Sequence, residues 1–112
     1  MSLRVLFAAV ALAISFAGAP IAGAAEPEFT IVIRDHKFEP SEVRIPANTK
    51  VRLIVDNQDS TAEEFESKEL KREKVIPPKS KGTVLIGPLK PGRYAFVGEF
   101  NEKTAKGVVI VE

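Results

Sequence analysis

The side chains best suited to chemistry in this sequence are a group of carboxylates and one imidazole. The chain has 112 residues, with no cysteine, one histidine and one methionine, which is Met1. Glu63, Glu64 and Glu66 form an acidic run around Phe65. If this run is a strand, its period of two places Glu64 and Glu66 on one face and Phe65 on the other. Acids this close repel one another unless water or a cation screens them, and oxygen ligands suit iron, manganese and other hard ions better than Cu(I).

Two further candidate ligands lie elsewhere in the chain. His36 follows the first expected strand and stands beside Asp35, a carboxylate suited to orienting its ring. Glu99 belongs to the Gly-Glu-Phe sequence of residues 98–100, where the glycine permits close approach of the backbone. Glu102 is a weaker candidate. The sequence therefore predicts a metal site at one end of the domain, with these ligands: His36, Glu64, Glu66 and Glu99.

Each of these features has a simpler interpretation. Charged edge strands protect sheets against aggregation, so the acidic run is also typical of a solvated edge. A single histidine at the end of a strand is often only exposed. The mixed-sign stretch of residues 68–74 indicates a solvated face or a docking surface.

Several chemistries are excluded by residue type. A blue-copper centre needs a thiolate, two imidazoles and usually a thioether, which this chain does not supply. A single histidine without cysteine forms no nucleophilic triad and no Cys/His zinc motif, and the sequence has no glycine-rich phosphate loop. We therefore expect no type 1 copper and no stand-alone enzyme, and only metal chemistry remains as a route to activity.

The amino terminus has the three-part pattern of a secretory signal. Arg4 precedes an apolar run at residues 5–17, and small residues follow at 22–24. The run is shorter than the roughly 20 residues that span a bilayer, although a retained anchor is the alternative. We predict a signal peptide over residues 1–24 and a periplasmic domain over residues 25–112. That domain carries 15 basic and 15 acidic residues, so its charge gives no support for nucleic-acid binding.

The elements that must position these side chains read as strands and turns. Residues 29–34 and 50–56 alternate apolar and polar positions, as half-buried strands do. Tyr94 follows a tight Pro-Leu-Lys-Pro-Gly turn, and we expect its hydroxyl to bond to nearby backbone. Further strands are expected at residues 42–45, 83–86, 93–100 and 107–111. The pattern predicts an all-β, antiparallel Greek-key β-sandwich of about seven strands.

Three segments resemble the cupredoxin pattern over nearly all of residues 25–112. They read FEP…IPA from residue 38, VRLIVDNQD from residue 51 and LKPGRYAF from residue 89. In that pattern a copper histidine follows the segment that ends here in Asn57-Gln-Asp, and the remaining ligands come from the loop near Glu99. The resemblance implies that acids at residues 63–66 stand where a nitrogen ligand is usual.

A narrower resemblance comes from residues 63–67, 72–76 and 98–105. These are similar to the FtrB-type periplasmic proteins encoded with bacterial ferrous-iron permeases, and to the N-terminal domain of EfeO-type proteins. The resemblance implies binding of iron or copper at the cell envelope, and help in Fe(II) oxidation or in delivery to an inner-membrane iron permease or a periplasmic iron-binding partner. Asn101 stands where that family often has a histidine.

The alternative function is a non-metal interaction module that docks on an envelope permease or redox partner. The oligomeric state is left open by the sequence.

Overall fold

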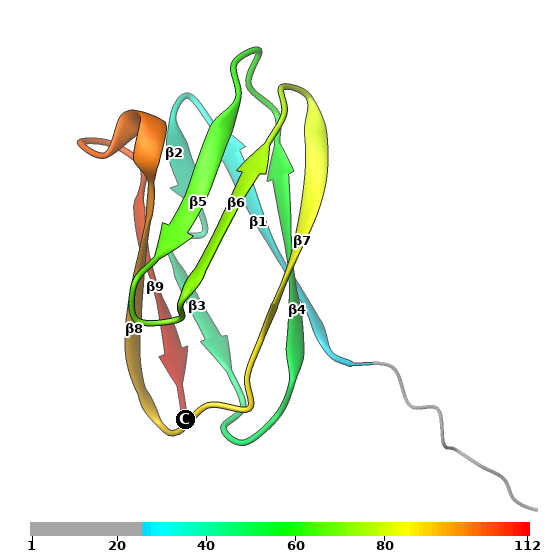
Figure 1. Cartoon of the computed structure of the whole chain (residues 1–112), viewed down its shortest axis with the longest axis vertical. Helices are drawn as coiled ribbons and strands as arrows, with labels where there is room; N and C mark the ends of the chain where they lie inside the picture. The colour runs from blue at the N-terminus through cyan, green and yellow to red at the C-terminus, as the bar shows by residue number, and fades with distance from the viewer. Residues whose placement is uncertain (1–25) are drawn as a thin grey trace, which may run out of the picture.

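The structure is a computed structural model that describes residues 26–112. The predicted signal peptide of residues 1–24 lies outside the described residues. The described part consists of nine strands and one short 3₁₀ helix (Figure 1). Their bounds are β1 Glu28–Arg34, β2 Lys37–Glu39, β3 Glu42–Ile45, β4 Val51–Asn57, β5 Glu63–Ser67, β6 Arg72–Ile76, β7 Ser80–Ile86, β8 Gly92–Gly98, η1 Glu99–Asn101 and β9 Lys106–Val111. Within residues 26–112, no helix has the length and apolar character needed to cross a membrane.

The strands form two sheets with the orders β2-β1-β4-β7 and β3-β9-β8-β5-β6. The predicted all-β sandwich is confirmed, but the structure differs in strand number and in two strand pairs. β1 runs parallel to β4, and β3 runs parallel to β9. Neither pair is joined by a hairpin, because other strands lie between its members in the chain. The chain leaves the first sheet after β2 and enters the second sheet at β3. Only hairpin partners must be antiparallel, so both sheets are mixed.

The core lies between the sheets and is centred on three phenylalanines. Phe38, Phe65 and Phe96 come from β2, β5 and β8, and each is at most 4% exposed. The ring centroids of Phe38 and Phe96 are 4.9 Å apart, and those of Phe65 and Phe96 are 5.0 Å apart. Aromatic pairs in this range add to the stabilisation from burial. Phe65 therefore faces inward as predicted, which turns Glu64 and Glu66 to the outer face of β5.

The two ends of the sandwich carry different elements. The β1–β2 turn, the β4–β5 loop and η1 lie at the end drawn uppermost in Figure 1, whereas the carboxyl terminus lies at the other end. The turn before β8 is at that second end. There the Tyr94 hydroxyl donates to the Lys90 carbonyl oxygen at 2.8 Å, which confirms the structural role predicted for this tyrosine. The candidate ligands all belong to β5 or to elements at the upper end.

Candidate metal-binding face

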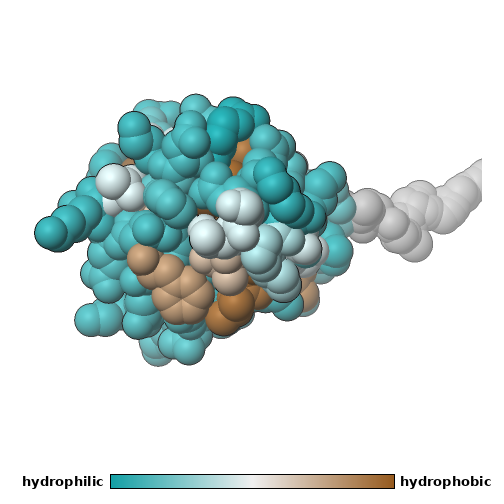
Figure 2. Space-filling view, turned by 90° about the horizontal axis from the view of Figure 1, so that it is seen from above, coloured by the Kyte–Doolittle hydropathy of each residue, from teal (hydrophilic) through white to brown (hydrophobic). Residues whose placement is uncertain are grey.

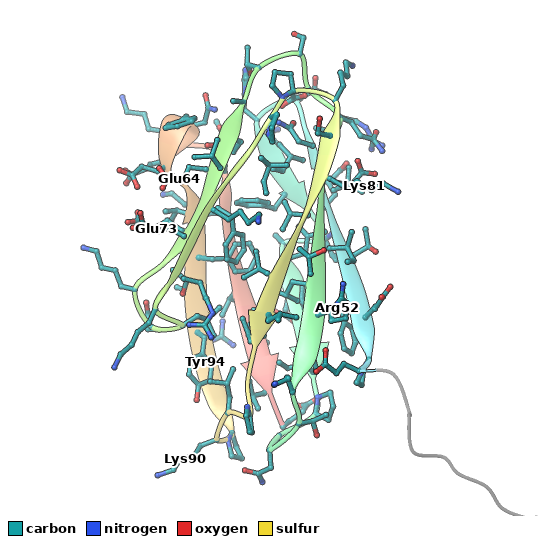
Figure 3. All side chains as sticks on the ribbon, turned by 45° about the vertical axis from the view of Figure 1, so that its right-hand side comes forward. Arg52, Glu64, Glu73, Lys81, Lys90 and Tyr94 are labelled. Carbon is teal, nitrogen blue, oxygen red and sulfur yellow. The ribbon has the colours of Figure 1, made fainter. Side chains whose placement is uncertain are left out.

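Glu64 and Glu66 lie on the outer face of β5 and belong to a wider acidic surface. β5 lies between β6 and β8, with Glu66 opposite Glu73 on one side and opposite Val97 on the other. Directly opposed residues of antiparallel strands place their side chains on the same face. Figure 3 shows Glu64 and Glu73 projecting together from this side of the sheet. Glu99 joins them because η1 begins directly after β8.

A groove of about 390 Å³ runs along this face beside β5 and β8. Four carboxylates line it, those of Glu66, Glu69, Glu99 and Glu102. Among the described residues in its wall, Lys68 is the only one with a cationic side chain. The groove therefore presents strong negative charge to solvent.

Glu66 and Glu99 both line this groove, and each carboxyl affects the other. A hydrogen bond to Glu66 and the repulsion of its charge raise the pKa of Glu99 to about 7, with smaller contributions from lost hydration, Glu64 and Glu102. The pKa of Glu64 is also raised, first by partial loss of hydration and then by the charges of Glu73 and Glu66. Two carboxyls that cannot both ionise freely favour a shared proton or a bound cation.

No basic side chain neutralises these acids in the described part of the chain. The ion pairs found within residues 26–112 use carboxylates elsewhere: Glu26, Glu28, Glu39, Glu42, Asp59 and Glu112. The same residues also contain no group of three or more His, Cys, Asp or Glu side chains arranged to hold a metal ion.

His36 lies apart from this pair. It occupies the tight β1–β2 turn, where Asp35 and His36 both have positive φ, at 54° and 59°. The carboxylate of Asp59 accepts both backbone N–H groups of the turn, from Asp35 at 2.8 Å and from His36 at 2.9 Å. The His36 Nδ1 atom is 3.5 Å from Asp59 Oδ2, so the acid beside the ring is Asp59 and not the sequence neighbour Asp35.

The contacts of Asp59 with this turn also shift the pKa of its own carboxyl. Burial raises its pKa, but the two backbone N–H groups and the nearby charges of His36 and Lys79 outweigh this effect and lower it. His36 lines a second groove of about 380 Å³ together with residues of the 100–104 loop, including Phe100 and Glu102. The structure therefore gathers Glu64, Glu66 and Glu99 on one face, and it places His36 in a second groove that shares Glu102 with the first.

Glu63 differs from its acidic neighbours because it is buried. It is 1% exposed, since it shares the inward face of β5 with Phe65. Glu63 Oε1 accepts the backbone N–H groups of Glu64 at 2.9 Å and Phe100 at 2.8 Å, and Oε2 accepts Asn101 Nδ2 at 2.7 Å. The sequence did not single out this role, although the parity of Glu63 and Phe65 along the strand was a signal for it.

The residues at this end do not fit a blue-copper ion. The resemblance places the acids of residues 63–66 where a copper histidine is usual, and the oxygens of one of them, Glu63, already accept three N–H groups. In the opposite loop, a Cβ atom on Gly98 would lie 2.6 Å from the Glu63 carboxyl carbon and 2.7 Å from the Ala105 Cβ. A side chain at Gly98 would therefore collide with this carboxyl. The expectation of no type 1 copper rests on residue type, because the chain has no cysteine and one histidine.

Comparison with known proteins agrees with the two-sheet architecture. The family model described as a cupredoxin-like domain matches residues 4–111, and the chain belongs to this family. An uncharacterized protein, RP394 of Rickettsia prowazekii (strain Madrid E), is 49% identical over 84 residues, which are 75% of this chain and 67% of that protein.

Two solved structures illustrate the shared fold. The metal-binding domain of the Cu(I)-exporting P-type ATPase CopA of Streptococcus pneumoniae D39, solved with Cu(I), aligns with a TM-score of 0.68 at 15% identity, covering 76% of this chain and 84% of that one. Auracyanin B aligns with a TM-score of 0.67 at 16% identity, covering 85% of this chain and 96% of its own. At this level of identity the similarity concerns the fold alone.

Proposed function

We propose that this protein is a periplasmic accessory of bacterial iron uptake that binds a hard cation, with iron as the favoured ion, between Glu66 and Glu99. The observation that carries the proposal is the pairing of these two carboxyls in an acidic groove that contains a single basic side chain among its described residues. The resemblance of residues 63–67, 72–76 and 98–105 to iron-uptake proteins of the envelope supports iron over other hard ions.

The proposed chemistry is an exchange of a proton for a metal ion. Near neutral pH Glu99 is about half protonated, because the pKa of its carboxyl is about 7. An arriving Fe(II) displaces that proton and gains two carboxylate oxygens, while the neighbouring acids Glu64 and Glu73 add long-range attraction. Carboxylate ligands favour Fe(III) over Fe(II), so they ease oxidation by an electron acceptor that a partner protein supplies. Delivery would then proceed to an inner-membrane permease or a periplasmic iron-binding protein.

Calorimetric titration with Fe(II) under anaerobic conditions, and with Mn(II) and Cu(II), tests this proposal. We expect micromolar binding of Fe(II) and Mn(II) that Glu66→Gln weakens at least tenfold. Glu28→Gln is the matched control, because Glu28 is an exposed glutamate on β1 of the other sheet. Binding no tighter than millimolar, or binding unchanged by Glu66→Gln, would refute the proposal.

A second candidate function is a docking module that needs no metal. The observation that favours it is an exposed apolar patch at the upper end of the sandwich, which Figure 2 shows as a brown area within a hydrophilic surface. Phe100 of η1 is 54% exposed, and Val75 of β6 is 51% exposed. A partner pull-down that survives chelator, and that fails in Phe100→Ser and on charge reversal at Lys68 and Lys71, would support this function. Arg72 is a poor target for such a test because its Nε donates to the Leu85 carbonyl oxygen at 2.8 Å.

A further inference from the structure

The buried carboxylate of Glu63 joins β5 to the loop between β8 and β9. Two of its three N–H donors, the Phe100 amide and the Asn101 side chain, belong to that loop. The third is the amide of its own neighbour, Glu64. The distances of 2.7–2.9 Å are those of strong, well-formed hydrogen bonds. Both oxygens of a side chain that is 1% exposed are therefore satisfied.

The loop is shaped to receive this carboxylate. It is closed by backbone hydrogen bonds from the Gly98 N–H to the Ala105 carbonyl oxygen at 2.9 Å and from the Ala105 N–H to the Asn101 carbonyl oxygen at 2.8 Å. The missing side chain at Gly98 and the small one at Ala105 leave the space that Glu63 fills. Any larger residue at Gly98 would displace the carboxylate.

Glu99 lies between two points that this network fixes. Gly98 precedes it and packs against the Glu63 carboxyl, and Phe100 follows it and donates its backbone N–H to the same group. We propose that Glu63 and Asn101 are positioning residues, which hold η1 against β5 and thereby keep Glu99 beside Glu66 on the outer face. The functional part of this inference rests on the proposed cation site, whereas the structural part is independent of it.

Exchanging the two polar groups tests the inference. In Asn101→Asp, two acceptor oxygens face each other, and we expect the melting temperature to fall by about 10 °C. In Glu63→Gln the fall is smaller, because the Asn101 amide can turn and present its oxygen. In the double variant Glu63→Gln/Asn101→Asp, a donor again meets an acceptor at unchanged net charge. We expect its melting temperature to return to within a few degrees of the original value.

Asn48→Asp supplies the matched control, because it makes the same chemical change in a loop at the other end of the sandwich, away from the Glu63 network. It should leave the melting temperature unchanged within about 2 °C. The inference is overturned if Asn101→Asp costs as much when combined with Glu63→Gln as it does in the unaltered protein, because the two side chains would then act independently.

A second measurement separates positioning from stability. Asn101→Ala should weaken Mn(II) binding about tenfold while the protein stays folded, and Thr104→Ala on the same loop should not. Equal Mn(II) affinity in Asn101→Ala and the unaltered protein would overturn the positioning role. If the unaltered protein itself binds no Mn(II), the proposed function fails, and the exchange of Glu63 and Asn101 still decides the structural part.

Discussion

Two carboxylates on β5, three residues apart, lie in opposite environments. Glu63 faces the core and accepts three N–H groups, whereas Glu66 faces solvent among other acids. The difference follows from the two-residue period of the strand, which separates odd from even positions. A carboxylate surrounded by N–H donors, such as Glu63, stabilises the fold, because these donors already compensate its negative charge. A carboxylate beside like charges, such as Glu66, retains the capacity to bind a cation.

The largest expected effect separates the two acids by stability. Glu63→Ala leaves three N–H groups without an acceptor and opens a cavity, so we expect a loss of about 3–5 kcal/mol in the free energy of unfolding. Glu66→Ala removes like-charge repulsion at the surface and should change that free energy by no more than about 0.5 kcal/mol. Urea unfolding followed by fluorescence or circular dichroism measures both. Similar losses for the two variants would remove the distinction between them.

A second prediction concerns the dependence of stability on pH. The pKa of Glu99 is raised to about 7 in the folded protein, so the folded state binds more protons than the unfolded chain between pH 4.5 and 7. Stability linked to this group is therefore greatest below pH 4.5 and is lost as pH rises through 7. Glu66→Gln removes the charge that raises the pKa, so the variant should lose less stability than the unaltered protein between about pH 5 and 8. Unfolding curves at several pH values check this, and parallel profiles for the two proteins would contradict it.

A smaller effect is expected from Glu73, the neighbour of Glu66 on β6. Glu73→Lys replaces a like-charge cross-strand pair with an opposite-charge pair and should stabilise the domain by about 0.2–1 kcal/mol. The same change should weaken cation binding, because it neutralises part of the face. Denaturation in about 0.5 M salt supplies the control, since screening should reduce the gain. A gain that persists undiminished in high salt would point to a cause other than charge.

The smallest effect is expected at His36. Because this side chain lines a different groove from Glu66 and Glu99, His36→Ala should change cation affinity by less than about twofold. Calorimetry on the variant measures this directly. A tenfold loss would restore the ligand role that the sequence predicted for the histidine.

The sequence predicted the features that depend on local period and composition. Alternation around Phe65 correctly placed Glu64 and Glu66 on one outer face, and the turn before Tyr94 was found from its prolines and glycine. β6 was not predicted as a strand because most of its residues are exposed and give no apolar signal. The parallel pairs β1–β4 and β3–β9 join segments far apart in the chain, which no local pattern reveals.

The site was predicted only in part for the same reason. Asp59 reaches His36 across 23 residues, and Asn101 reaches Glu63 across 38, so neither contact has a sequence signature. No role was predicted for Asn101 from the sequence. In the structure its amide donates to the buried Glu63 carboxylate.

The most direct test of the central claim is the number of protons released when Mn(II) binds. Calorimetry at about pH 6.5 in two buffers with different ionisation enthalpies gives this number. Because the pKa of Glu99 is about 7, binding between Glu66 and Glu99 should release most of one proton, and Glu66→Gln should abolish both the release and the tight binding. Binding without proton release, or release that survives in Glu66→Gln, would contradict a cation site at this pair of carboxylates.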